Sequence, residues 1–318
     1  MGKNARRRTM ETFLTRRRNV AALAVFCCAL WGSATPVIKV GYRLFAIRGA
    51  VLGDLFLFAG VRFALSGLLT ILIGSLGQRR FLRPKGDSWG MVAVLALIQT
   101  IMQYICYYVG LQHITAVKGS ILNTLGVFMC LVVSALVFHQ ERFTARKVVG
   151  CLVGFAGVVL VNLTPGAFSG AVTFLGEGMI FLSALAYATS SCFIKVFSRR
   201  EDPVTLSGYQ FLMGGLVLAV LGLLLGGELS PQSPSAFAAL GYLAFLSAAA
   251  YSVWGLLLRH NPVSSVAVFG FLNPIIGVIL SALLLREQQS ASWVQCAAAL
   301  AMVSIGIITI NRPGKERP

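Results

Sequence analysis

RRRNVAALAVFCCALWGSATPVIK, residues 16–39, sets three arginines directly before a long run of mostly apolar residues. A helix that crosses the hydrocarbon core of a bilayer needs about 20 such residues, so this stretch predicts a transmembrane helix over Val20–Lys39. The run is too long for the apolar core of a signal peptide, and no small-residue cleavage site follows it. We therefore expect a retained first span whose basic flank lies in the cytoplasm.

The composition of the whole chain resembles that of this first stretch. Of 318 residues, 57% are hydrophobic and 12% are charged, and the mean hydropathy is +0.81. Soluble domains have about 25% charged residues, so this composition excludes a soluble globular enzyme and a disordered chain. The net charge of +17 is compatible with nucleic-acid binding. The basic residues, however, stand in short clusters between apolar runs, which indicates membrane topology and no nucleic-acid partner.

Nine further apolar runs follow, and several of the gaps between them contain proline or glycine, as at 83–86, 164–166, 226–227 and 231–234. The sequence thus predicts an all-α integral membrane protein with ten transmembrane helices. The expected spans are Val20–Lys39, Leu52–Ser75, Trp89–Leu111, Gly119–Phe138, Val148–Leu163, Phe174–Phe197, Val204–Leu225, Ala236–Leu257, Val263–Leu285 and Trp293–Ile310.

The lysines and arginines set the orientation, because cytoplasmic loops carry an excess of them. With the N-terminus inside, most of the 27 basic residues fall in the cytoplasmic tails and loops. The exceptions are Arg62 inside the second span and, outside, Lys39, Arg43, Arg48, Lys118 and Arg286. We expect a multi-pass protein of the cell (inner, cytoplasmic) membrane with both termini in the cytoplasm.

Enzyme motifs are missing or out of context. The sequence has no HExxH, GxGxxG or Walker pattern, and the GxSxG match at 86–90 stands in a loop entering a helix, where no strand–turn–helix elbow is expected. The seven cysteines lie in apolar runs without a CxxC, which indicates small buried residues and not disulfides or ligands. We expect no enzyme activity, no cofactor and no metal.

The two halves of the chain repeat a weak pattern. Trp31-Gly32-Ser33 corresponds to Tyr187-Ala188-Thr189, Leu122-Asn123 to Leu272-Asn273, and Glu141 to Glu287. Five spans per half is an odd number, so the second half is inverted. Such repeats are typical of secondary transporters, in which the substrate site lies between the halves near the bilayer midplane. The expected division is a basic tail 1–19, a first repeat 20–163, a linker 164–173, a second repeat 174–310 and a C-terminal tail 311–318.

At these positions the sequence resembles the EamA-type permeases of the drug/metabolite transporter superfamily. The resemblance rests on Ala29-Leu30-Trp31-Gly32-Ser33 with Lys39, Arg62-Phe63, Glu141-Arg142, Gly176-Glu177, Asn273-Pro274 and Glu287. It implies ten helices around a central cavity, and export or exchange of small metabolites such as amino acids. The family's proline within the fourth span is replaced by Val127 or Phe128, whereas Pro274 remains as a hinge in the ninth. The fourth span is therefore expected to be straighter than its counterpart.

Polar residues inside a bilayer are costly and tend to face a cavity, and Arg62 is the leading case. Its guanidinium suits a substrate carboxylate, or it forms a structural pair with a helix end or Asp54; the sequence leaves both open. Gln99, Gln103 and Tyr107 form a stripe on the third span. The other candidates for the substrate-binding site, which packing explains nearly as well, are Trp31, Thr35, Asn123, Tyr187, Gln210, Tyr251, Trp254 and Asn273.

Two further features concern mechanism and packing. Glu177 is the candidate for proton coupling, although uncoupled exchange fits the residues equally well. GxxxG pairs at Gly150/Gly154 and Gly222/Gly226 predict close helix contacts, inside the chain or in a homodimer. The favoured function is a carrier that moves a small polar or amphipathic metabolite across its lipid bilayer by alternating access, with export as the favoured direction. The alternative is a non-transporting or lipid-handling membrane component, such as a flippase subunit or a sensor.

Overall fold

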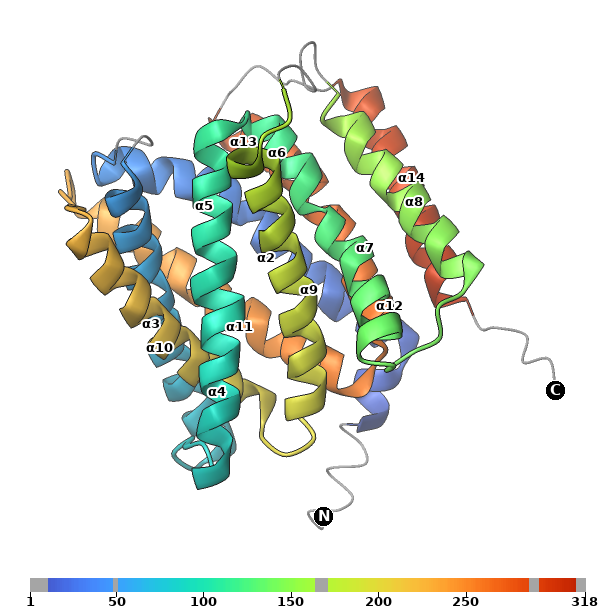
Figure 1. Ribbon diagram of the computed structural model, residues 1–318, viewed down its shortest axis with the longest axis horizontal. Helices are drawn as coiled ribbons and strands as arrows, with labels where there is room; N and C mark the ends of the chain where they lie inside the picture. The colour runs from blue at the N-terminus through green and yellow to red at the C-terminus, as the bar shows by residue number, and fades with distance from the viewer. Residues whose placement is uncertain (1–10, 48–50, 164–170, 286–291, 313–318) are drawn as a thin grey trace.

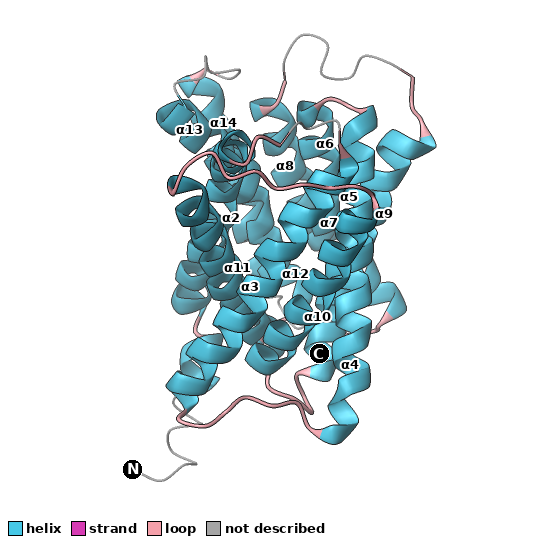
Figure 2. Cartoon of the chain, turned by 90° about the vertical axis from the view of Figure 1, so that its left-hand side faces the viewer, coloured by secondary structure: helices cyan, strands magenta, loops and turns pink. Residues whose placement is uncertain are grey.

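The computed structural model describes residues 11–47, 51–163, 171–285 and 292–312, and over these ranges it is all-helical, without a strand (Figures 1 and 2). Nine helical segments in this part of the chain are long and apolar enough to cross a membrane. They are Arg17–Leu44, Leu52–Gln78, Gly86–His113, Lys118–Val137, Phe174–Phe197, Pro203–Leu224, Ser235–His260, Val263–Leu283 and Trp293–Asn311. A further helix, α8 (Ala145–Val161), has 17 residues and a length of about 25 Å at ~1.5 Å per residue.

Five of the nine segments are single helices: α2 (Arg17–Leu44), α3 (Leu52–Gln78), α10 (Pro203–Leu224), α11 (Ser235–His260) and α14 (Trp293–Asn311). The other four are interrupted. The third segment joins α4 (Trp89–Leu95) and α5 (Gln103–His113) through a wide π-helical stretch, Ala96–Met102. The fourth joins α6 (Ala116–Asn123) and α7 (Leu125–Val132), with a π-helical end at Val133–Val137. A π-turn at Phe174–Gly178 leads into α9 (Met179–Phe197), and a 3₁₀ turn at Val268–Phe271 separates α12 (Val263–Ala267) from α13 (Leu272–Leu285).

The helices pair across the two halves of the chain. In Figure 1, α3 and α10 pack together at one margin of the bundle, and α8 and α14 pack together at the other. Between these pairs, α2 packs on α11 and α13, while α9 packs on α5 and α7. Each half therefore buries its apolar surface mainly against the other half.

Glycines allow the α3–α10 pair to approach at backbone distance. Gly53, Gly60 and Gly67 repeat every seven residues on α3, and they face Gly222, Gly215 and Gly208 of the antiparallel α10. A Cβ on Gly60 would lie 2.2 Å from the backbone nitrogen of Ala219, and one on Gly215 would lie 2.3 Å from that of Ala64. No side chain fits there without moving a helix, which is the geometry of small-residue helix contacts in membranes.

The two GxxxG pairs behave differently. Gly150 and Gly154 pack inside the chain, where added Cβ atoms would meet Ile310 and Phe271. Gly222 packs on the backbone of Leu57 in the same way. Gly226 does not take part in packing: it has open space around it and a positive φ of 74°, so it ends α10 as a turn residue.

The fourth segment lacks a proline and was expected to be straighter than the ninth segment, but this prediction is wrong. It is interrupted at Thr124, much as the ninth is interrupted just before Pro274. The hydroxyl of Thr124 donates to the carbonyl of Ile121 at 2.6 Å. Side-chain bonds to a preceding carbonyl are often found at helix bends, and this one lies where the segment is interrupted.

Both ends of the described chain lie at one end of the bundle, which we call the terminal end. There the amide of Asn261 donates to the carbonyl of Leu14 at 3.0 Å, and that of Asn311 donates to Ser265 at 3.3 Å. The start of α2, the α11–α12 turn and the end of α14 thus meet. At the opposite end, the N–H of Glu228 donates to Asp54 at 2.8 Å.

The glycine contact between α3 and α10 gives a direct test of the fold. Gly60→Ala forces the two backbones apart and should cost about 3 kcal/mol or more of stability, since overpacking of a closed contact already costs 1–3 kcal/mol. Gly241→Ala on α11, where nothing lies within 4 Å, is the matched control and should leave stability unchanged or slightly higher. Thermal melting in detergent measures both, and equal melting temperatures for the two variants would contradict the close contact.

Candidate functional site

The centre of the site is a buried arginine on α3. Arg62 is 4% exposed, and its Cζ lies 4.3 Å from the ring centroid of Phe63 and 5.9 Å from that of Tyr104. Aromatic faces stabilise a cation at these distances. The Nε of Arg62 is buried without a hydrogen-bond partner.

The structural pairing with Asp54 is not formed. Asp54 accepts from the backbone N–H of Glu228. The ion pairs among the described residues are Lys118–Glu177 and Lys147–Glu141. Within that part of the chain Arg62 has no carboxylate partner. An uncompensated buried charge is expensive, so this guanidinium is suited to an anion that arrives from outside the protein.

Aromatic rings from both halves form a connected series of ring contacts that begins at Phe63 and Tyr104 beside Arg62, and we call them the aromatic cluster. Its members are Trp31 of α2, Phe63 of α3, Tyr104 of α5, Phe211 of α10, and Tyr251 and Trp254 of α11. Phe63 stacks on Phe211 at 5.2 Å with an interplanar angle of 7°. Trp31 meets Tyr251 and Trp254 edge-on at 5.1 and 4.9 Å. The structure thus brings four predicted residues together: Arg62, Trp31, Tyr251 and Trp254.

Two predicted glutamines bind each other. The Nε2 of Gln210 donates to the Oε1 of Gln99 at 3.1 Å, and the hydroxyl of Thr100 donates to the Oε1 of Gln210 at 2.7 Å. All three side chains are buried. Gln99 and Thr100 lie in the π-helical stretch, whose wide turn is a feature frequent at functional sites. In this conformation the network ties the third segment to α10.

Several buried polar atoms remain without partners. Besides the Nε of Arg62, they include Trp31 Nε1, Trp254 Nε1, Gln103 Oε1 and Asn273 Oδ1. Most buried polar atoms in proteins are hydrogen-bonded, and unsatisfied ones call for an explanation. These five belong to predicted site residues, and other unpartnered atoms, such as Ser66 Oγ and Ser183 Oγ, lie elsewhere. A polar ligand or ordered water is one way to satisfy such atoms.

The remaining predicted residues lie apart from the aromatic cluster or at its edge. Thr35 is exposed and sits beside Gly277 of α13, and Asn123 is exposed at the end of α6. Tyr107 packs on Tyr108 at 5.8 Å, and Tyr187 lies against Gly126 of α7. Pro274 follows the 3₁₀ turn between α12 and α13.

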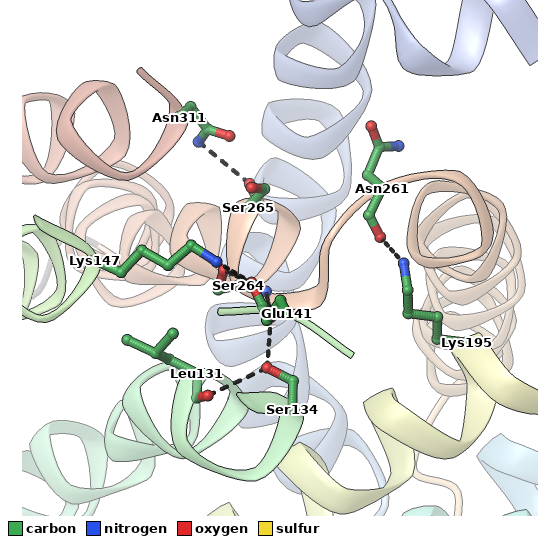
Figure 3. Close-up of polar contacts among 9 residues, drawn as sticks. All are labelled: Leu131, Ser134, Glu141, Lys147, Lys195, Asn261, Ser264, Ser265 and Asn311. Carbon is green, nitrogen blue, oxygen red and sulfur yellow. Dashed lines mark hydrogen bonds and ion pairs between the residues drawn. The ribbon is translucent and has the colours of Figure 1, made fainter. Parts of the chain in front are cut away.

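A carboxylate joins the two halves at the terminal end. Glu141 accepts from the N–H of Ser264 at 3.0 Å, and its other contacts are the hydroxyls of Ser134 and Ser264 and the ammonium of Lys147 (Figure 3). Burial alone raises the pKa of Glu141, but these hydrogen bonds outweigh it and hold the pKa below the ordinary value of 4.5. Glu141 is therefore ionised at neutral pH and links the end of the fourth segment to α8 and α12.

A second carboxylate joins the halves at the opposite end. Glu177, in the π-turn before α9, forms an ion pair with Lys118 of α6 and accepts from the N–H of Thr173 at 2.8 Å. Glu177 lies at a helix start near an end of the bundle, and it is therefore not a carboxylate partner of Arg62. Glu287, the counterpart of Glu141 in the repeat, lies outside the described residues.

Sequence reasoning missed the Glu141–Ser264 contact and the role of Phe63, Tyr104 and Phe211. The glutamate and the serine are 123 residues apart, and no spacing rule connects them. Phe63 directly follows Arg62, and Tyr104 directly follows Gln103. An aromatic residue next to a charged or polar residue inside a span is a pattern that could have identified these two rings. The ammonium of Lys195 donates to the carbonyls of Leu258 and Asn261 at the end of α11, a contact between distant residues.

Known proteins share this architecture. The chain is similar to an uncharacterized transporter of Bacillus subtilis (strain 168), YvbV, with 25% identity over 95% of this chain and 94% of the relative. An uncharacterized transporter of Archaeoglobus fulgidus is 30% identical over 81% of this chain and 86% of its own length. A chloroplastic WAT1-related protein of Arabidopsis thaliana is 25% identical over 87% of this chain and 66% of the relative. One solved crystal structure has a TM-score of 0.74 at 19% identity, covering 93% of this chain and 98% of that chain, so the fold is shared.

The EamA-like transporter family matches residues 19–163 and again residues 174–311. These two matches cover most of the chain and indicate a transporter, not an enzyme. The chain is thus a multi-pass membrane protein that belongs to the EamA-like transporter family.

Proposed function

We propose that this protein is a secondary transporter of ten transmembrane helices, built from two inverted repeats at 20–163 and 174–310. The pairing of helices supports the inversion. A two-fold axis that exchanges the halves maps the α2–α11 contact onto α9–α5 and the α2–α13 contact onto α9–α7, and it maps α3–α10 and α8–α14 onto themselves. Arg79, Arg80, Arg83, Arg142 and Arg200 in the loops of the terminal end support a cytoplasmic location of that end in the cell membrane.

The substrate we propose is a small metabolite that carries a carboxylate beside an apolar group, such as an amino acid, and the direction is export. Arg62 carries this proposal, because a buried guanidinium without an acidic partner binds a carboxylate in a bidentate manner. The aromatic cluster supplies the apolar wall, and Gln103 and Asn273 offer unpartnered amide oxygens for an ammonium group. Thr35, Tyr107, Asn123, Tyr187 and the Gln99–Gln210 pair remain candidates for a lining that forms in another state of the transport cycle.

Alternating access requires contacts that hold one end shut while the other opens. The two carboxylates supply one such contact at each end: Glu141 at the terminal end and Glu177 at the opposite end. Both bind across the halves, so each must break when its end opens. The bend before Pro274, next to the α2–α13 contact, serves as the hinge.

Replacement of Arg62 should lower the transport rate without lowering the melting temperature. Arg62→Met removes an uncompensated buried charge and keeps apolar volume, so its melting temperature should equal or exceed that of the wild type. Transport should fall about 30-fold or more, because loss of one partner of a buried charge contact costs 2 kcal/mol or more. Arg62→Lys should retain only a small part of the transport, since it loses the bidentate geometry. Counterflow of labelled amino acids in proteoliposomes measures the rates.

Arg142→Met, at an exposed position, is the matched control and should transport normally. Wild-type rates in both Arg62 variants would remove this residue from the substrate site. Absence of transport in the wild type for amino acids and organic acids, from protein that melts cooperatively, would favour the lipid-handling alternative.

For energy coupling, we propose that a proton on Glu177 releases Lys118 and opens the opposite end. Glu177→Gln should abolish transport driven by a pH gradient, while exchange of labelled for unlabelled substrate continues. Glu228→Gln, an exposed glutamate at the same end, is the control. Full gradient-driven transport by Glu177→Gln would assign the coupling elsewhere or indicate an uncoupled exchanger.

The Glu141 contact predicts a pH-dependent contribution to stability. Since the pKa of Glu141 is lower in the folded state than the ordinary 4.5, the contribution is complete above about pH 4.5 and is lost as the pH falls through the folded-state value. Glu141→Gln should therefore melt below the wild type at pH 7, and this difference should shrink on acidification below about pH 4.5. The exposed Asp87→Asn variant should show no such trend, and a difference for Glu141→Gln that stays constant with pH would contradict the assignment.

A further inference from the structure

A basic pocket lies at the terminal end, away from Arg62. It has a volume of about 460 Å³ and is formed by the loop after α3, the loop between α9 and α10, and the last turn of α11. Its lining side chains are Arg80, Arg83, Lys85, Arg199, Arg200, Glu201, Asp202 and Arg259. Six of these eight residues are cationic, and the pocket draws them from both halves of the chain.

Hydrogen bonds fix the walls of the pocket. The buried Leu82 anchors the first loop: its N–H donates to Ser75 at 2.9 Å, and its carbonyl accepts from the hydroxyl of Tyr209 at 3.0 Å. Lys85 joins the two loops, because its N–H donates to Glu201 at 2.9 Å and its ammonium donates to the carbonyl of Arg200. These bonds hold the backbone of the two loops that carry most of the basic side chains.

The two acidic residues of the pocket are already occupied. Glu201 accepts from the N–H groups of Lys85 and Asp202. Asp202 caps α10 through the N–H of Thr205 at 3.2 Å and accepts from Gln78 at 3.0 Å. Arg80 donates to the neutral Gln78, and within the described residues none of the five arginines forms an ion pair. Like charges held this close repel one another, and a bound anion relieves that repulsion.

Apolar side chains next to the pocket indicate the kind of anion. Phe81, between two lining arginines, is 72% exposed, and Leu76 on the last turns of α3 is 70% exposed. Trp89, at the start of α4, is 43% exposed and packs edge-on against Tyr209 at 5.4 Å. A tryptophan at a helix end marks the headgroup level of a bilayer. The basic pocket and a surface for acyl chains thus adjoin each other.

We propose that this pocket binds the phosphate headgroup of an anionic phospholipid, with the acyl chains lying over Leu76 and Phe81. Basic pockets between transmembrane helices are known to hold such headgroups. A lipid bound here contacts loops from both halves of the chain and joins them at the terminal end.

The test uses the purified full-length protein in a neutral detergent, titrated with phosphatidylglycerol, phosphatidylcholine or inorganic phosphate, with the melting temperature as readout. Phosphatidylglycerol should stabilise the wild type, and the other two should have little effect. Arg83→Gln/Arg200→Gln should bind phosphatidylglycerol about 30-fold more weakly, which corresponds to ~1 kcal/mol per basic side chain. Arg83→Lys/Arg200→Lys should keep most of the affinity.

Arg142→Gln/Arg146→Gln is the matched control, because it removes two arginines from the same end outside the pocket. It should respond to phosphatidylglycerol as the wild type does. Equal weakening in the pocket and control variants would overturn the proposal in favour of diffuse surface charge. An equal shift with phosphatidylcholine would overturn the headgroup preference, and saturation by millimolar inorganic phosphate alone would indicate a soluble anion and no lipid. Melting curves without added lipid establish that each variant is folded.

Discussion

The contact between α3 and α10 is the constraint on which the rest of the structure depends. Their backbones meet along six glycines, three on each helix, so the register between the two halves has no freedom to slide. Arg62 lies two residues after Gly60, and Gln210 and Phe211 lie between Gly208 and Gly215. The same contact that joins the halves therefore sets the depth of the buried charge and brings Phe63 and Phe211 face to face. Rigid packing at one margin of the bundle positions a site in its middle.

The distribution of acidic groups gives this site its character. Asp54, Glu141, Glu177, Glu201 and Asp202 each bind a backbone N–H, and all five lie near the ends of the bundle. They fasten loops and helix starts, and none of them neutralises Arg62. The protein thus keeps a buried positive charge within α3 and an excess of positive charge in the pocket of the terminal end. In both places we propose that an anion from outside the chain balances this charge.

The helices and the family could be predicted because both depend on local signals. Apolar runs of about 20 residues identify spans without any tertiary information, and an arginine inside such a run stands out by its cost. The rest depends on contacts between distant residues. The sequence indicates that Gln99 and Gln210 are candidates for the substrate-binding site, but only the structure shows that they bind each other. The fourth segment is interrupted at Thr124, whose side chain bonds to a preceding carbonyl, although the sequence has no proline there. The spacing of Gly222 and Gly226 predicts helix packing, but the positive φ angle of Gly226 shows that it is a turn residue.

The pairing of helices across the halves also determines the order in which the fold can form. α2 packs on α11 and α13, α3 on α10, and α8 on α14. During synthesis the first half leaves the ribosome before these partners exist, and its glycine faces and Arg62 then meet lipid or the translocation machinery instead of protein. Assembly of the final contacts must wait for α14, the last helix of the described chain. Early truncation therefore removes partners from the whole bundle and not only from its C-terminal end.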